Sequence, residues 1–180
     1  MTQTKMLNFA IQTAKGAGAI LMEHFGNISS YEHKSTPIDL LTIADTQSET
    51  FIINEIKATF PDHHIIAEES ASIANNSHYR WVIDPLDGTT NFVHSLPIFA
   101  VSIGLQYKNE TIVGVVYNPA ADKMFCGTIN NGAYLNEKSI NIRFSSSEDK
   151  YPRLAKIVED VPPISDKIFP SSLIKIFLNI

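Results

Sequence analysis

The sequence predicts an α+β fold in which helices pack on a mainly antiparallel sheet. Apolar residues recur at helical spacing between Leu7 and Phe60, whereas strand-like apolar runs joined by short turns follow Ile98. Strands joined by short turns pair in antiparallel order. Because the helices come from the first half and most strands from the second, we expect the helices to form a layer on one face of the sheet.

The first helix is predicted between Leu7 and Phe25. Apolar residues follow the helical repeat in this segment, and Gly26 comes directly after it. Glycine readily takes the left-handed conformation that ends many helices, so Gly26 is the predicted stop. Gly16 would allow a neighbouring element to pack closely. No residue of this helix suggests chemistry, and the helix is expected to be scaffold.

A second helix is predicted to begin at Asp45 and to end near Phe60. Aspartate is a favoured N-cap residue, and Pro61 cannot continue a helix. The preceding residues 34–42 are expected to form a loop leading into a short strand. Residues 64–67, His-Ile-Ile-Ala, are expected to form a strand after the helix.

The second half of the chain reads as an antiparallel meander. Lys108-Asn109-Glu110 and Asn130-Asn131-Gly132 are predicted turns between apolar, β-branched runs. The predicted strands are residues 98–105, 111–117, 123–128 and 133–135.

Residues 81–92, Trp-Val-Ile-Asp-Pro-Leu-Asp-Gly-Thr-Thr-Asn-Phe, carry the candidate chemistry. The apolar run is predicted to be a buried strand ending in Asp84, and Pro85 should stop it because proline lacks an N–H for the ladder. Gly88 permits a tight turn, and the Thr-Thr-Asn that follows offers N-cap residues for a helix. A helix start next to carboxylates and hydroxyls would favour a bound anion.

Asp84 and Asp87 should repel each other across this turn. At about 4 Å and an effective dielectric constant of about 20, two like charges interact unfavourably by roughly 4 kcal/mol. A divalent cation between them would remove that cost, and carboxylate and carbonyl oxygens suit Mg²⁺ or Mn²⁺ better than zinc. The alternative is an ordinary Asp-Gly turn in which Asp84 is a helix cap or a surface charge.

Composition limits the classes of partner. The 180 residues carry a formal net charge of −5, so no basic field would attract nucleic acid or an anionic membrane. No signal-peptide pattern and no apolar run of membrane-spanning length are present, so a cytoplasmic protein is expected. Cys126, the single cysteine, is predicted to be a buried free thiol, which fits a reducing compartment. The sequence leaves open a homo-oligomer.

The segment Asp-Pro-Leu-Asp-Gly-Thr-Thr-Asn-Phe at residues 84–92 resembles the first signature of the inositol monophosphatase family, which are Mg²⁺-dependent phosphomonoesterases. The resemblance runs from near the N-terminus to about Ile142. It implies the N-terminal half of a layered sugar-phosphatase-like fold. Residues 1–144 would form a metal-binding α+β domain, and residues 145–180 a divergent tail without family resemblance. Within the tail, the residue pattern alone suggests that Leu154 to Val161 could form one or two helical turns.

The resemblance implies Mg²⁺-dependent hydrolysis of a small sugar or polyol phosphate, with inositol monophosphate, hydrolysed to inositol and phosphate, as the expected substrate. Four residues would hold the metal. Three would bind it through their carboxylates, namely Glu68, Asp84 and Asp87, and Leu86 would bind it through its backbone carbonyl. Thr89 and Asp45 would orient the attacking water, and Glu68 is assigned to catalysis as well as to the metal. Three consecutive residues would bind the phosphate of the substrate: Gly88, Thr89 and Thr90.

The second signature of the family, built on a Trp-Asp pair, is absent, because Trp81 is the only tryptophan in the sequence. We therefore expect a C-terminally shortened member of the family. Two alternatives to a phosphatase stay open. The chain could be a non-catalytic remnant that binds metal weakly, or an interaction protein that uses an exposed sheet edge and its apolar tail.

Overall fold

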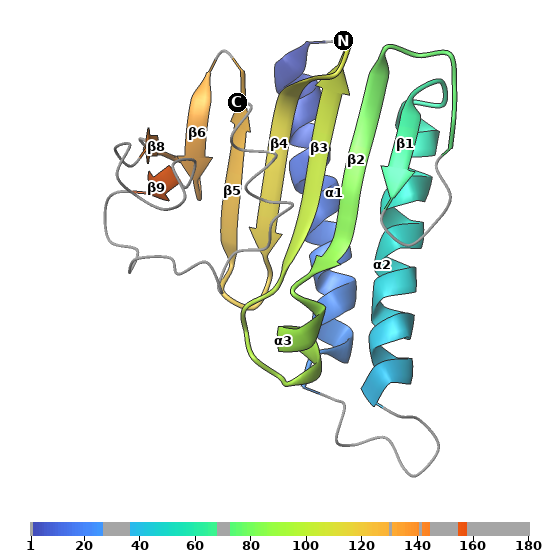
Figure 1. Ribbon diagram of the computed structural model, residues 1–180, viewed down its shortest axis with the longest axis vertical. Helices are drawn as coiled ribbons and strands as arrows, with labels where there is room; N and C mark the ends of the chain where they lie inside the picture. Colours follow the sequence, from blue (N-terminus) through green and yellow to red (C-terminus); the bar gives the residue numbers. More distant parts are fainter. Residues whose placement is uncertain are drawn as a thin grey trace.

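The computed structural model describes residues 2–26, 37–67, 73–129, 131–140, 142–144 and 155–157. Within these ranges, the side chains of residues 37–42, 142–144 and 155–157 are left undescribed. Figure 1 shows two long helices lying side by side behind one broad sheet. The predicted α+β class is confirmed.

Helix α1 spans Gln3–His24. It begins at Thr2, whose hydroxyl accepts a hydrogen bond from the Lys5 amide at 3.4 Å. It ends before Gly26, which has φ +77°, so the predicted glycine stop is confirmed. Gly16 lies against helix α2, because a Cβ atom at this position would come within 2.5 Å of the Phe51 ring. Glycine thus allows the close packing of the two helices that the sequence suggested.

Helix α2 spans Pro37–Thr59, and two predictions are wrong here. Residues 38–42 are helical instead of forming a short strand, and Asp45 lies inside the helix instead of capping it. Proline suits the first helical position, because its φ is already helical and its missing N–H would have no partner there. The helix therefore begins at Pro37, and the apolar residues after it extend the helical repeat. The predicted loop at residues 34–36 lies outside the described residues.

Seven strands form one sheet in sequence order. The first two strands are parallel, and every later neighbour is antiparallel. This confirms the predicted meander. The strands are β1 (His64–Ala67), β2 (Tyr79–Asp87), β3 (Ala100–Tyr107), β4 (Glu110–Asn118), β5 (Lys123–Thr128), β6 (Gly132–Leu135) and β7 (Lys138–Ile140).

The hairpin turns explain why the meander could be predicted. Lys108 and Asn109 have φ +50° and +70°, as a tight turn between antiparallel strands requires. Asn136 and Glu137 form a second such turn, with φ +45° and +68°, and it leads into β7, which the sequence did not suggest. Glutamate is an unusual residue for positive φ, so the local sequence carries little signal for this turn.

A second, two-stranded sheet pairs β8 (Ile142–Phe144) with β9 (Ala155–Ile157). The helical turns predicted for Leu154 to Val161 are therefore wrong at residues 155–157, which are extended. Backbone pairing with β8 satisfies the amide groups that a helix of one or two turns would leave unsatisfied. The division of the chain at residue 144 stays a prediction.

The two faces of the large sheet differ in their neighbours. Helix α1 packs on β3, β4 and β5, and α2 packs on β2, all on one side that we call the helix face. Its buried residues include Trp81, Ile83, Val101, Ile103, Leu105, Val113, Val115 and Cys126. The residues that alternate with these point the other way. This second face carries Arg80, Val82, Asp84, Ala100, Ser102, Gly104, Gln106, Gly114, Val116, Phe125 and Gly127.

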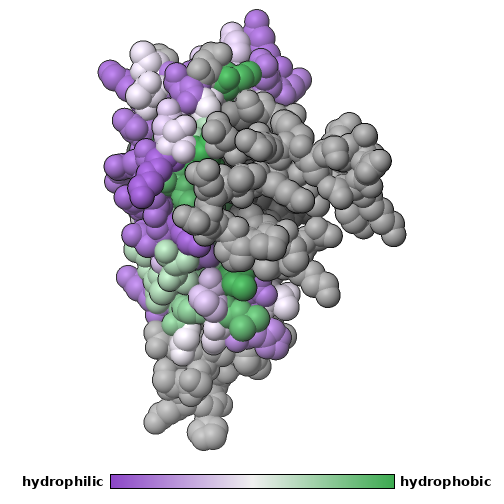
Figure 2. Space-filling view, turned by 90° about the vertical axis from the view of Figure 1, so that its left-hand side faces the viewer, coloured by the Kyte–Doolittle hydropathy of each residue, from purple (hydrophilic) through white to green (hydrophobic). Residues whose placement is uncertain are grey.

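The outer surface agrees with this arrangement. Much of the coloured surface in Figure 2 is hydrophilic, because the apolar sides of the helices are turned toward the sheet. Large exposed apolar side chains among the described residues are Met22, Ile43, Leu96 and Ile98. No helix in the described part of the chain is long and apolar enough to cross a bilayer.

Trp81 packs against several aromatic side chains at one end of the helix face. Its ring lies 5.5 Å from Phe9 and 5.4 Å from Phe60, centroid to centroid, and its indole N–H donates a hydrogen bond of 3.1 Å to His63 Nδ1. The His63 ring is stacked between Phe60 and Tyr79, with centroid distances of 4.8 and 4.7 Å. Burial lowers the pKa of His63, and the charge of Asp62 opposes this shift only in part.

Candidate metal centre

Strand β2 continues past Asp84 to Asp87, so the prediction that Pro85 stops the strand is wrong. Asp84 pairs with Ser102 of β3, and Asp87 pairs with Ala100. The interval from Asp84 to Asp87 therefore contains one residue more on β2 than the matching interval on β3. This is a β-bulge, a position where a strand tolerates proline because the ladder is already interrupted.

The bulge decides where the two carboxylates point. Residues three apart on a regular strand point to opposite faces. Here Asp84 and Asp87 pair with Ser102 and Ala100, which are two apart on β3 and share the second face. Both carboxylates therefore lie on the second face, whereas the Leu86 side chain between them enters the helix-face core. Asp87 is buried and Asp84 is half-buried.

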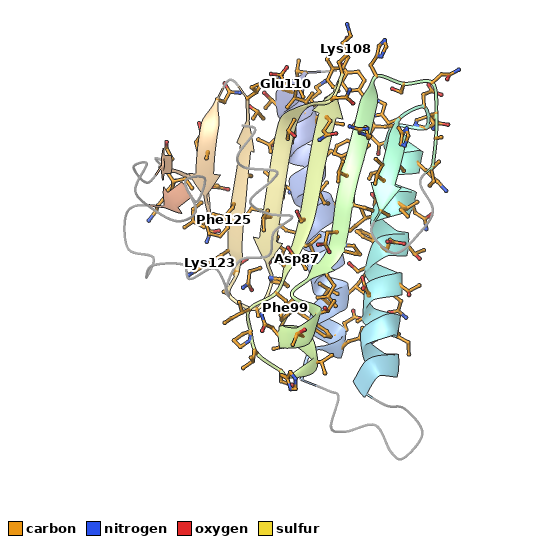
Figure 3. The ribbon with its side chains drawn as sticks, in the orientation of Figure 1. Asp87, Phe99, Lys108, Glu110, Lys123 and Phe125 are labelled. Carbon is orange, nitrogen blue, oxygen red and sulfur yellow. The ribbon has the colours of Figure 1, made fainter. Side chains whose placement is uncertain are left out.

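This carboxylate pair lies at one end of the sheet. Figure 3 shows Asp87 where β2 gives way to α3, with Phe99 close by on the segment that enters β3. Lys108 and Glu110 lie at the opposite end of the strands. The charged groups of that far hairpin are therefore separated from the carboxylates by the length of the sheet.

Gly88 makes the turn after the carboxylates. It has φ +91° and is itself the N-cap of α3 (Thr89–Val93), so the expectation of a Thr or Asn cap is wrong. A Cβ atom at Gly88 would lie 2.9 Å from the Ile98 carbonyl oxygen and 3.2 Å from Phe99 Cα. Both the backbone conformation and the available space therefore require glycine. Asn91 instead fixes the loop after α3, since its Nδ2 donates to the Ile98 carbonyl at 2.7 Å.

Helix α3 has five residues, which is a little more than one turn. The helix-dipole attraction expected for an anion here is correspondingly reduced, because so few peptide groups are aligned. Thr89 is half-buried and Thr90 is exposed at its start. Of these two, Thr89 follows Gly88 directly and lies closer in sequence to Asp87.

Helix α2 contacts the bulge through Ser48. Its hydroxyl donates a buried hydrogen bond of 3.2 Å to the Pro85 carbonyl oxygen. Asp45 lies one turn earlier on α2 and is 8% exposed, and Glu49 is buried next to Ser48. Residues three and four apart share a helix face, so Asp45 lies on the side of α2 that faces β2. We missed Ser48 and Glu49 as neighbours of the site, although their spacing from Asp45 was a usable signal.

Glu68, the remaining predicted carboxylate, lies outside the described residues. It follows Ala67, which pairs with Ile83, the residue before Asp84. Within the described ranges, no three His, Cys, Asp or Glu side chains gather as a metal cluster. The described part of the site therefore contributes two carboxylates, Asp84 and Asp87, on one face. Carboxylate oxygens of this kind fit a hard divalent cation such as Mg²⁺.

Cys126 takes no part in this site. It is a free cysteine, buried on the helix face, as the sequence predicted. Burial raises the pKa of its thiol, and the charge of Glu137 adds to the shift. The thiol is therefore held in its protonated form, which is neither a good metal ligand nor a good nucleophile.

A profile of the "Inositol monophosphatase family" matches residues 2–172. The chain belongs to this family. It is 43% identical over 146 residues to inositol monophosphatase 3 of Solanum lycopersicum, covering 79% of this chain and 54% of that protein. It is 41% identical over 145 residues to the fructose-1,6-bisphosphatase/inositol-1-monophosphatase of Aquifex aeolicus, with 79% and 54% covered.

The fold of this inositol monophosphatase family member also matches solved structures. The extragenic suppressor protein suhB from Bartonella henselae superposes with a TM-score of 0.69 at 34% sequence identity. The match covers 77% of this chain and 54% of that one. The chain thus spans about half the length of the relatives that it matches.

Proposed function

We propose that the chain provides the metal-binding half of a Mg²⁺-dependent phosphomonoesterase, acting on a small sugar or polyol phosphate such as inositol monophosphate. The observation that carries this proposal is the β-bulge, which sets Asp84 and Asp87 on one face directly before the Gly88 turn. Membership of the inositol monophosphatase family supports a phosphatase. The match to the tomato relative covers only 54% of that protein, so the activity of this chain is a proposal.

In this proposal the carboxylates of Asp84 and Asp87 hold Mg²⁺ together with Glu68 and the Leu86 carbonyl. Bound Mg²⁺ would supply Lewis-acid polarisation of the phosphate and of a water molecule. Gly88 allows the tight turn that sets the first backbone amides of α3 directly after the two carboxylates.

Two further side chains position reactants. The Thr89 hydroxyl, at the start of α3, would orient the attacking water, and Asp45 on the β2-facing side of α2 would accept the hydrogen bond that fixes this hydroxyl. Phosphate oxygens would be bound by the backbone amides of Gly88 and Thr89 and by Thr90. Water attacks phosphorus in line with the P–O bond to the sugar, so no covalent enzyme intermediate is required.

The identity of the substrate is the finer part of the proposal. The names of the relatives include inositol monophosphatase, fructose-1,6-bisphosphatase/inositol-1-monophosphatase and suhB. Inositol monophosphate is supported because that name recurs among the relatives and because residues 84–92 match the corresponding signature. A non-catalytic remnant that binds metal weakly is the second candidate, and the half-length match is the observation that favours it.

The test is release of phosphate from inositol 1-phosphate as a function of Mg²⁺ concentration. Asp87→Asn keeps the shape of the side chain and removes its charge, and we expect it to abolish both Mg²⁺ binding by calorimetry and phosphate release. Glu110→Gln is the matched control, because this exposed carboxylate lies at the opposite end of the sheet (Figure 3). We expect the control to behave as the wild type.

Three outcomes separate the candidates. Mg²⁺-dependent release that is lost in Asp87→Asn supports the phosphatase. Mg²⁺ binding without release, again lost in Asp87→Asn, supports the non-catalytic remnant. Equal Mg²⁺ affinity in wild type and Asp87→Asn would contradict both, because the metal would then be held elsewhere. Circular dichroism should confirm that each variant is folded.

A further inference from the structure

Ser102 occupies the position directly across from Asp84 in the β2–β3 ladder. It is 0% exposed and lies in the middle of β3, on the second face. Directly paired residues on antiparallel strands have Cβ atoms about 4.5–5.5 Å apart. The hydroxyl of Ser102 is therefore a near neighbour of the Asp84 side chain.

The Ser102 hydroxyl is unusual for a buried polar group. Its Oγ atom is shielded from solvent and makes no hydrogen bond with any described residue. Buried hydroxyl groups are normally paired, because leaving one unpaired costs stability. Ser48, which is also 0% exposed, follows the usual pattern, since its hydroxyl donates to the Pro85 carbonyl oxygen at 3.2 Å.

Packing alone gives no reason for a serine at this position. Its neighbours on the same face of β3 are Ala100 and Gly104, and the residue across on β4 is Val116. Small apolar residues are therefore accepted on either side. Alanine would fill nearly the same volume as serine without an unpaired hydroxyl. A locally unfavourable residue next to a candidate site is the pattern expected when function, and not stability, determines the choice.

We propose that Ser102 is a positioning residue, whose hydroxyl donates a hydrogen bond to Asp84 when Asp84 binds Mg²⁺. This rests on the proposed function. A carboxylate that binds a metal through one oxygen leaves the other oxygen as an acceptor. Hydrogen bonds to such ligands fix their orientation, and their loss typically lowers metal affinity about 10- to 100-fold. Ser102 is a buried donor on the strand next to Asp84, and its hydroxyl makes no hydrogen bond with any described residue.

The experiment compares three variants in two measurements, thermal unfolding of the metal-free chain and Mg²⁺ affinity by calorimetry. Ser102→Ala should raise the Tm of the metal-free chain, because it removes a buried unpaired hydroxyl, and should lower Mg²⁺ affinity about 10- to 100-fold. Ser102→Cys nearly preserves the volume but offers only a weak donor, so it should also lose affinity. Ser48→Ala, the matched control, should lower the Tm because it breaks a formed hydrogen bond.

The outcomes distinguish this proposal from the proposed function. A Ser102→Ala chain that binds Mg²⁺ as tightly as a binding-competent wild type would overturn the role of Ser102 alone. A lowered Tm for metal-free Ser102→Ala, similar to that of Ser48→Ala, would also overturn it, since the hydroxyl would then be structural. A wild-type chain that binds no Mg²⁺ would overturn both proposals together.

Discussion

The helix face and the second face of the large sheet are built from alternate residues of the same strands, yet they differ in kind. On β2 and β3 the helix face carries Trp81, Ile83, Ile103 and Leu105, each almost fully buried. The second face of the same strands carries Val82, Asp84, Ala100, Ser102 and Gly104. Ala100 also belongs to a smaller apolar cluster with Val116 and Phe125. The main core and the candidate chemistry are therefore separated by the pleat of the strand and not by distance along the chain.

This difference has a consequence for mutagenesis. Ile83 and Asp84 are adjacent in sequence, but we expect their substitution to affect different properties of the protein. Changes on the helix face should lower the free energy of unfolding, because they leave cavities between sheet and helices. Changes at the carboxylates should alter metal binding, because Asp84 and Asp87 carry the charges that we propose a divalent cation neutralises.

The largest expected effect is on the helix face. Ile103→Ala removes most of a side chain that is 0% exposed, and we expect it to reduce the free energy of unfolding by about 2–5 kcal/mol. Val82→Ala on the second face, where the side chain is half-buried, should cost less than about 1.5 kcal/mol. Urea unfolding measures both. Equal losses would show that the two faces are packed alike.

The next largest effect on stability is expected at Gly88, in the turn between β2 and α3. Gly88→Ala combines a left-handed backbone with a Cβ atom 2.9 Å from the Ile98 carbonyl oxygen, and we expect a loss of about 2–4 kcal/mol. Gly26→Ala is the control. Gly26 has φ +77°, but no described atom lies within 4 Å of its added Cβ, so only the backbone cost of about 1–2 kcal/mol should appear. A Gly88→Ala chain no less stable than Gly26→Ala would remove the steric argument.

A third comparison tests whether small residues of the second face are required by their neighbours. A Cβ atom at Gly127 would lie 2.8 Å from the Gly132 carbonyl oxygen, which is part of the paired β6 backbone and cannot easily move. Gly127→Ala should therefore destabilise the chain by about 1–3 kcal/mol. At Gly16 the added Cβ would lie 2.5 Å from the end of the Phe51 side chain. This side chain can swing about its Cα–Cβ bond more easily than a paired strand can move, and alanine favours the helix. Gly16→Ala should change stability by less than about 1 kcal/mol in thermal melts.

The smallest effect concerns pH and the helix face. The pKa of His63 is below its ordinary value of 6.5, so the folded chain disfavours the protonated ring. The unfolded chain takes up the proton first as the pH falls, so stability is complete above pH 6.5 and is lost as the pH falls through the lower folded-state pKa. Protonation at Nδ1 would also remove the acceptor for the Trp81 indole N–H.

His63→Gln keeps a side-chain acceptor for this N–H but does not titrate. Unfolding followed by the fluorescence of Trp81, the only tryptophan, should show a weaker loss of stability below pH 6.5 in this variant than in the wild type. If the wild type and His63→Gln lost stability identically as the pH falls, a group other than His63 would be responsible for the pH dependence.

Turn residues and apolar periodicity were sufficient to predict much of the fold. The meander followed from the Lys108-Asn109 turn and the β-branched run at residues 111–117, and α1 followed from its repeat and from Gly26. These features depend on local backbone preferences, which a single sequence expresses directly. The start of α2 was predicted too late, because Asp45 resembles a cap when only its own side chain is considered.

The shared face of Asp84 and Asp87 could not be read from the sequence. A spacing of three on a regular strand would have separated them, and the strand end that we predicted at Pro85 left their directions open. The bulge arises from pairing with Ala100 and Ser102, which lie on another strand. The buried contact of Ser48 with the Pro85 carbonyl likewise joins segments that are distant in sequence. Such tertiary pairings override local propensity.

The bulge also makes a shifted alignment of β2 against β3 unfavourable. If β2 slid by one residue to restore a regular ladder, the Leu86 side chain would swing out to the carboxylate side, and the charge of Asp87 would be driven under the helices. Burying an uncompensated charge is far more costly than interrupting one rung of a ladder. Asp87, which we propose as a metal ligand, would thus disfavour the misaligned chain.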